Sequence, residues 1–318
     1  MEEQILQANT ILRSYNWMFI HPYMRGYHIQ LIIDRHQQGT LTPDFVRDFF
    51  IRNFYDLDST ISFVDGFFKR SAYFEPFNYF IETSLCLCFQ RDYAGAINVI
   101  LPCIEGILAR YLETVEQIDL SSKRYERIKK ASFYLQQRLV MQYEAFLETE
   151  GTHTIQQKDH LVKTERRYYA DWFDAVEQFM KDALFASTSS GSAVTGLNRH
   201  VIFHSLSVQS YNSLDNYIKL FNCLRFLIWA FLQIEGQSIL NHIDTETFLD
   251  KRLLYEALLD ESVKMTPIKQ GILRDYPLHD KNSLSSNIPF ERIEQKLSLT
   301  GKLLLRWRRF SLIKGWAN

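Results

Sequence analysis

Hydrophobic residues recur every three or four positions over most of the chain, which is the pattern of amphipathic helices. Over residues 5–89 this spacing predicts several short to medium helices, with breaks at 39–43 and near 75–76. Thr42 followed by Pro43 predicts a helix start, because Thr can cap the first turn and Pro lacks an N–H that the first turn does not need.

Two further helices are expected over residues 78–90 and 93–116. Pro102 lies inside the second and predicts a kink, since proline removes one hydrogen bond of the helix. The second helix has a single apolar face that predicts burial. This face consists of Ile97, Ile100, Leu101, Ile104, Leu108 and Leu112.

The pattern over residues 163–185 predicts a helix that buries one aromatic face, and the small polar residues at 187–192 predict a loop after it. Residues 214–234 then form a long pattern that is apolar on most sides toward its end. Such a helix is expected at the centre of a bundle.

Changes in composition and in the hydrophobic pattern along the chain divide it into three predicted regions. These are an N-terminal helical region over residues 1–60, a helical domain over 61–240, and a C-terminal extension of helices and loops over 241–318. The tail from Lys296 combines basic and apolar residues. It could dock on the domain, bind RNA or touch a membrane surface, and docking on its own protein is the most common fate of such a helix.

The composition supports an all-α fold. With 12 Gly and 7 Pro against 24 Phe and 17 Tyr, the chain has too little turn-forming chemistry for a many-stranded sandwich or barrel. The 46% of hydrophobic residues is ample for a continuous core. The formal net charge of −1 excludes a global field that would attract nucleic acid, so any such contact must be local.

The cysteines and the N-terminus point to a cytoplasmic protein. Cys86, Cys88, Cys103 and Cys223 all lie in apolar helical stretches and read as reduced core residues. The first ten residues carry two acids and no basic stretch, which argues against a signal peptide. The apolar run at 226–232 is far shorter than the ~20 residues that cross a bilayer, so no membrane span is expected.

A basic stretch at residues 121–131 gives one local positive face. A solvated helix surface is the simpler interpretation, and an RNA-binding surface that follows the phosphate backbone is the alternative. The candidate RNA-binding residues are Lys123, Arg124, Arg127 and Lys130.

The strongest candidate chemistry lies between Asn198 and His204. Asn198 is a good helix cap, so Arg199 falls in the first turn, where free N–H groups already attract anions such as phosphate. His204 can take a proton from a ribose 2′-hydroxyl or give one to a leaving oxygen, while arginine stabilises the negative charge. RNA supplies its own nucleophile, so neither a metal nor another cofactor is required.

Arg199, the polar His200, three apolar residues and His204 match the R-x4-6-H signature of the HEPN superfamily, and residues 61–238 resemble one of its bacterial branches. The sequence departs from the pattern at Ser205, where Gly is more usual. The resemblance implies a helical bundle and a metal-independent endoribonuclease of the toxin–antitoxin or abortive-infection kind. It also implies a homodimer in which two motifs face one cleft.

Several residues could support this motif. Glu105 interrupts an apolar face and is the best candidate for a carboxylate that orients His204 or Arg199, although it could instead face solvent or pair elsewhere. Asn198 and Tyr211 are candidate RNA or phosphate contacts. His200 and His204 could also bind zinc as an i, i+4 pair, but no third ligand is evident.

The leading hypothesis is therefore an endoribonuclease with Arg199 and His204 as catalytic residues, restrained by an antitoxin or regulatory protein. The alternative is a non-catalytic helical module that binds RNA or protein, in which Arg199 forms a structural ion pair and His204 lies in the core. No glycine-rich phosphate loop or serine-nucleophile motif supports another enzyme class.

Overall fold

The computed structural model describes residues 2–15, 17, 24–115, 117, 124–151, 153–185, 197–199, 202, 211–237 and 245–273. For Glu2, Arg124, Tyr125 and residues 267–273 it describes only the backbone. The loop predicted at 187–192 and the basic tail lie outside the described residues. Chain contacts divide the protein into a unit of residues 1–264 and a unit of residues 265–318.

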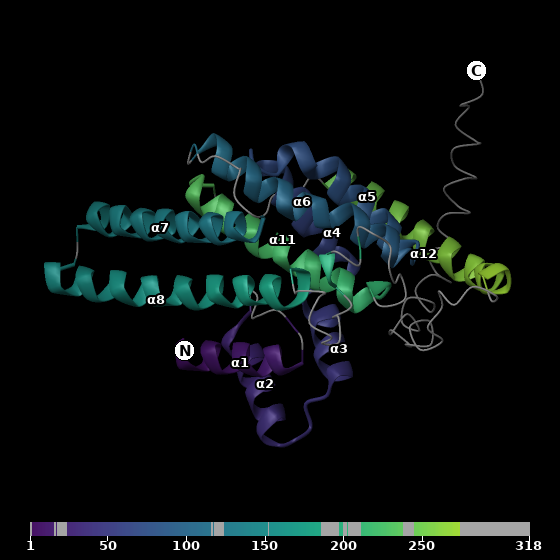
Figure 1. Cartoon of the computed structure of the whole chain (residues 1–318), viewed down its shortest axis with the longest axis horizontal. Helices are drawn as coiled ribbons and strands as arrows, with labels where there is room; N and C mark the ends of the chain where they lie inside the picture. Colours follow the sequence, from purple (N-terminus) through teal and green to yellow (C-terminus); the bar gives the residue numbers. More distant parts are fainter. Residues whose placement is uncertain are drawn as a thin grey trace. The chain divides into compact units, whose positions relative to one another are not determined.

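Throughout its described part the chain is helical and contains no strand (Figure 1), which confirms the all-α class. The α-helices are α1 (Glu2–Ser14), α2 (Gly26–Gln37), α3 (Pro43–Phe54), α4 (Leu57–Gly66), α5 (Asn78–Phe89), α6 (Tyr93–Thr114), α7 (Arg124–Glu150), α8 (Ile155–Phe179), α11 (Leu214–Ile234) and α12 (Thr245–Leu273). Shorter segments are the 3-10 helices η1 (Phe68–Arg70) and η2 (Glu75–Phe77) and the π-helix η3 (Met180–Leu184).

The predicted break at residues 39–43 is confirmed. Gly39 has a φ of +65°, a conformation that glycine adopts without the steric penalty of a side chain. The hydroxyl of Thr42 then accepts a hydrogen bond from the backbone N–H of Phe45 at 3.1 Å, and Pro43 is the first residue of α3. The local sequence alone therefore determines where α3 begins.

Helices α5 and α6 pack against each other and lie close to their predicted bounds. The whole predicted apolar face of α6 is buried. Pro102 is exposed and lies inside the continuous helix α6. Its missing N–H is therefore on the solvent side, where it disrupts packing least.

Helix α11 is the central helix of the larger unit, as predicted. Every residue from Leu220 to Ile228 is buried, which includes all sides of the helix. It contacts α6 and α7, and its Phe226 and Trp229 lie against Trp172 of α8, with ring centroids 5.9 and 5.2 Å away. An all-round apolar helix is stable only with neighbours on every side.

The N-terminal helices join this core through polar groups of α11. The hydroxyl of Tyr55 donates a hydrogen bond to the side-chain oxygen of Asn222 at 2.7 Å. Buried Arg225 donates to the carbonyl of Phe54, and its guanidinium lies 3.9 Å from the ring centroid of Phe63. The described residues of the predicted 1–60 region thus belong to the same compact unit as α11.

Helices α7 and α8 form an antiparallel hairpin and lie side by side (Figure 1). Helix α8 begins at Ile155, not near Lys163 as predicted, and continues into the π-helix η3. Its start is a capping box in which Thr154 and Gln157 exchange hydrogen bonds at 2.9 and 3.3 Å. The first two turns of α8 are polar and mostly exposed, so their hydrophobic pattern is too weak to predict a helix.

Helix α12 is a long helix within the C-terminal extension of helices and loops predicted over residues 241–318, where no helix bounds were predicted. Its Tyr255 is buried and packs on Phe89 of α5, with ring centroids 4.7 Å apart. Lys251 donates to Asp65 of α4 at 2.8 Å and to Glu82 of α5 at 2.6 Å. The part of α12 up to residue 264 is therefore held to α4 and α5 by apolar and ionic contacts.

Two described helices, α6 and α11, are long and apolar enough to cross a membrane by length and composition alone. More than half of the apolar window of α6 and about three quarters of that of α11 are buried among other helices. Burial of this kind fits core helices of a soluble protein, since a lipid-facing helix would expose its apolar sides.

Candidate functional site

The start of the motif forms a helical turn. The backbone N–H of Ile202 donates to the carbonyl of Asn198 at 3.0 Å, an i to i+4 bond that makes Asn198 the residue before the first turn. Leu197 and Ile202 are buried and anchor this turn to the core. Arg199 is thereby the first residue of the turn.

Arg199 forms an ion pair with Glu105, which lies in the middle of α6. Its Nε donates to Oε1 of Glu105. The two side chains are 22% and 21% exposed, so the pair is mostly buried but still reachable from solvent. A charge-assisted hydrogen bond in such a setting fixes the arginine more firmly than a surface ion pair would.

The neighbouring Gly106 allows close packing around this pair. A Cβ atom at position 106 would lie 2.5 Å from Cε1 of Phe77, closer than atoms approach without displacement. The absence of a side chain therefore lets the Phe77 ring lie directly on α6, one residue from Glu105. Glu105 projects from a helix whose neighbours are packed, which limits its movement.

The two histidines of the motif, His200 and His204, lie outside the described residues, and so does the proposed zinc pair that they would form. Among the residues that are described, no three His, Cys, Asp or Glu side chains gather into a metal site. The structure thus places the arginine of the motif and one carboxylate partner.

Asn198 and Tyr211 are both buried and belong to the packing around the motif. The backbone carbonyl of Tyr211 accepts from the N–H of Ser213 at 2.8 Å and from the side chain of Asn216 at 3.2 Å, which shapes the start of α11. A fully buried tyrosine ring offers no surface to RNA. The burial of both side chains therefore favours a structural role over direct contact with RNA.

The basic stretch at the start of α7 is partly described. Lys130 is exposed and Arg127 is half-buried, whereas Lys123 and the side chain of Arg124 lie outside the description. Burial raises the pKa of Glu177 on α8 above its ordinary value, and the charge of Lys129 opposes this shift. One base of this stretch, Lys129, is therefore close to an acid of its own protein.

Two charged clusters were not singled out from the sequence. One is the group of Asp65, Lys69, Glu82 and Lys251, which joins α4, η1, α5 and α12. The other is a groove between α7 and α8. For the groove, the available sequence signal was the spacing of charged residues at three and four positions. The first cluster could not be predicted from spacing, because α4 and α12 are far apart in the sequence.

Compared with protein-family models, curated proteins and solved structures, the chain matches none of them.

Proposed function

We propose that this protein is a metal-independent endoribonuclease. The observation that carries the proposal is the Arg199–Glu105 ion pair, because it fixes a guanidinium at the first helical turn of the motif. The start of a helix favours an anion such as phosphate. Catalysis of RNA cleavage needs a positive group that is oriented before the phosphate arrives. The HEPN resemblance supports the same assignment.

In the proposed reaction the ribose 2′-oxygen forms a bond to phosphorus, and the bond from phosphorus to the 5′-oxygen breaks. The 2′-hydroxyl gives up its proton and the leaving 5′-oxygen gains one. His204 carries out one of these two transfers and water the other, as a histidine with an ordinary pKa of about 6.5 can do. Arg199 stabilises the charge that builds up on the phosphate oxygens. The products are a 2′,3′-cyclic phosphate and a 5′-hydroxyl.

The wider setting is also part of the proposal. The enzyme would act in the cytoplasm as a homodimer and serve in a toxin–antitoxin or antiviral defence system, under the control of an antitoxin or regulatory protein. A nuclease that attacks cellular RNA must be restrained, which is the physical reason to expect such a partner.

The test is cleavage of a structured RNA in the presence of EDTA by the full chain and by Arg199→Ala and His204→Ala. Both substitutions are expected to lower the rate by about 100-fold or more, since each removes one group that acts in the transition state. Arg47→Ala is the matched control, because Arg47 forms an ion pair with Asp44 on α3 at 2.9 Å.

The second candidate is a non-catalytic helical module, and the same ion pair favours it, because a structural arginine also needs a carboxylate. A folded wild-type chain that cleaves no RNA at protein excess, or Arg199→Ala protein that cleaves as fast as wild type, would favour this alternative.

A further inference from the structure

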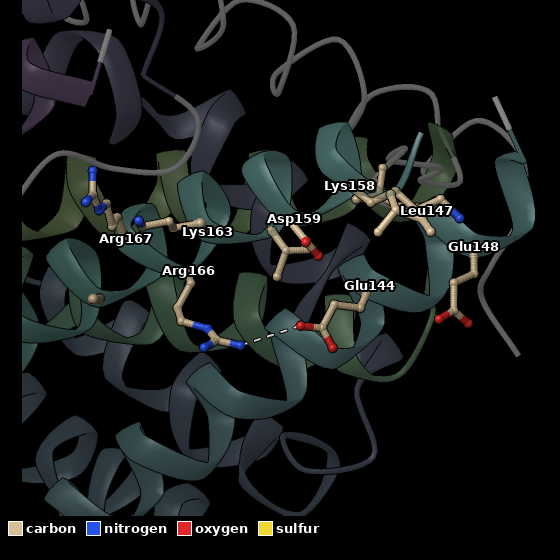
Figure 2. A pocket seen from close by; sticks show the side chains of 11 residues that line it. Glu144, Leu147, Glu148, Lys158, Asp159, Lys163, Arg166 and Arg167 are labelled. Carbon is tan, nitrogen blue, oxygen red and sulfur yellow. Dashed lines mark hydrogen bonds and ion pairs between the residues drawn. The ribbon is translucent and has the colours of Figure 1, made fainter. Parts of the chain in front are cut away.

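A solvent-open groove runs between α7 and α8, with a cavity volume of about 930 Å³ (Figure 2). Its walls come from the half of each helix that lies next to the hairpin turn. Glu144, Leu147 and Glu148 form the α7 wall. Along α8 the lining residues are Ile155, Lys158, Asp159, Val162, Lys163, Arg166, Arg167 and Ala170.

The charges of the groove are separated by helix. The α7 wall carries two acids and no base, whereas the α8 wall carries four bases and one acid. Across the groove, Arg166 contacts Glu144 at 3.5 Å between two well-exposed side chains, a pair that contributes little in water.

Most of the remaining charges have no ionic partner within the described part of the chain. This holds for Glu148 on α7 and for Lys158, Lys163 and Arg167 on α8. In Figure 2 Lys163 and Arg167 lie on the far side of Arg166 from Glu144. Like charges four residues apart on a helix repel one another, as Lys163 and Arg167 do on α8 and Glu144 and Glu148 do on α7, whereas Asp159 offsets part of the positive charge near Lys163. A partner of opposite charge would therefore stabilise each wall.

Apolar side chains extend the same surface. Met141 lies three and seven residues before Glu144 and Glu148 and so shares their face of α7, and Phe133 lies two turns earlier. These two side chains are 64% and 52% exposed, and Ile155 at the start of α8 is 80% exposed. Among the described residues of the hairpin, three of the four large exposed apolar side chains therefore lie along this surface, and Phe146, on the opposite face of α7, is the fourth. Three such side chains on one face indicate a surface that is covered by a partner.

We propose that this groove binds the same groove of a second copy of the chain. A two-fold axis along the hairpin places α7 of each copy against α8 of the other, so each acidic wall meets a basic wall. The four helices then form a bundle that covers Phe133, Met141 and Ile155. The acids Glu144, Glu148 and Asp159 make the groove a poor surface for RNA phosphates.

Charge reversal of one wall at a time tests the proposal. Glu144→Lys/Glu148→Lys makes both walls basic, and Lys158→Glu/Lys163→Glu makes the α8 wall largely acidic while it leaves Arg166 in place. Each double variant alone is expected to raise the dimer dissociation constant at least about tenfold in sedimentation equilibrium, because like-charged walls then face each other. An equimolar mixture of the two is expected to form a heterodimer at wild-type affinity.

The mixture separates this interface from an effect on folding, since a variant that unfolds cannot be restored by the other variant. Circular dichroism of each variant provides the check of helix content. A wild-type chain that stays monomeric would overturn the proposal. It would equally be overturned if each double variant alone dimerises like wild type, or if the mixture associates no better than its components. The same is true if the wild-type groove binds RNA as a monomer.

Discussion

Glu105 and Gly106 are neighbours in α6, and each provides something different for the motif. Glu105 supplies the carboxylate that binds Arg199, and Gly106 supplies the space for the ring of Phe77. The sequence indicated that Glu105 needed a partner, because an acid interrupts an apolar face there. It could not choose between Arg199 and His204, since spacing does not reveal how α6 lies against residues 197–202.

Glu105→Gln is expected to reduce RNA cleavage about tenfold or more, because the amide keeps the shape but loses the charge that orients Arg199. Glu105 is here a positioning residue, so RNA affinity should change less than the cleavage rate. Single-turnover rates and binding curves measured on the same RNA separate the two effects. A variant with unchanged rates would show that the ion pair is only structural.

Gly106→Ala is expected to destabilise the protein by about 1–3 kcal/mol, because the new Cβ atom must displace the Phe77 ring. Without this clash, alanine in a helix would be stabilising by about 1 kcal/mol. Gly26→Ala is the control, since nothing lies within 4 Å of a Cβ there. Urea unfolding of both variants gives the comparison, and a stabilised Gly106→Ala protein would contradict the predicted packing.

His28 predicts a dependence of stability on pH. It is buried, and its Nδ1 accepts the N–H of Arg25 at 3.2 Å. Burial, and secondly the charge of Arg25, lower its pKa below the ordinary 6.5. The unfolded chain therefore binds the proton first, so this contribution to stability is complete above about pH 6.5 and decreases as the pH falls toward the lowered pKa.

His28→Gln should weaken this dependence, because glutamine can accept the same hydrogen bond without becoming charged. The measurement is the free energy of unfolding at about pH 7.5 and about pH 5.5 for both proteins, a range in which histidine is the main residue to titrate. Equal losses on acidification in wild type and variant would exclude His28 as the cause.

At the scale of the elements, the sequence predicted helices where an apolar stripe or a cap was clear. Helix α11 was placed at its observed bounds because its apolar run is dense. Within the C-terminal extension the bounds of α12 were not predicted, because exposed leucines at 249, 253 and 254 surround the buried Tyr255 and hide the periodicity. Its position depends on contacts with α4 and α5, which no local pattern reveals.

Lys251→Met is expected to loosen α12. Lys251 neutralises Asp65, whose side chain is only 4% exposed, and its removal leaves Lys69 as the remaining base of the cluster. The expected cost is about 2 kcal/mol, below that of a fully broken buried pair. Backbone amides of α12 should then exchange hydrogen faster. The control is Lys264→Ala, at an exposed position of the same helix, which should leave the exchange rates as they are in wild type. If Lys251→Met also leaves them as in wild type, the proposed role of the cluster is contradicted.

At the scale of the whole molecule, an all-α fold with a buried central helix follows from the composition and the periodicity. The candidate site depends on long-range contacts: residues 105 and 199 are far apart in sequence and meet only because α6 packs beside the motif. Because the formal net charge is only −1, the RNA substrate of the proposed function would have to be attracted by local basic groups.

The most direct test of the ribonuclease proposal is the chemistry of the cut. Wild-type protein in EDTA should cleave an RNA to leave a 2′,3′-cyclic phosphate, and the same RNA with a single 2′-deoxy sugar at the cut site should resist cleavage there. Cleavage at the deoxy position, or products with a free 3′-hydroxyl, would show that the 2′-oxygen is not the nucleophile and would contradict the proposed mechanism.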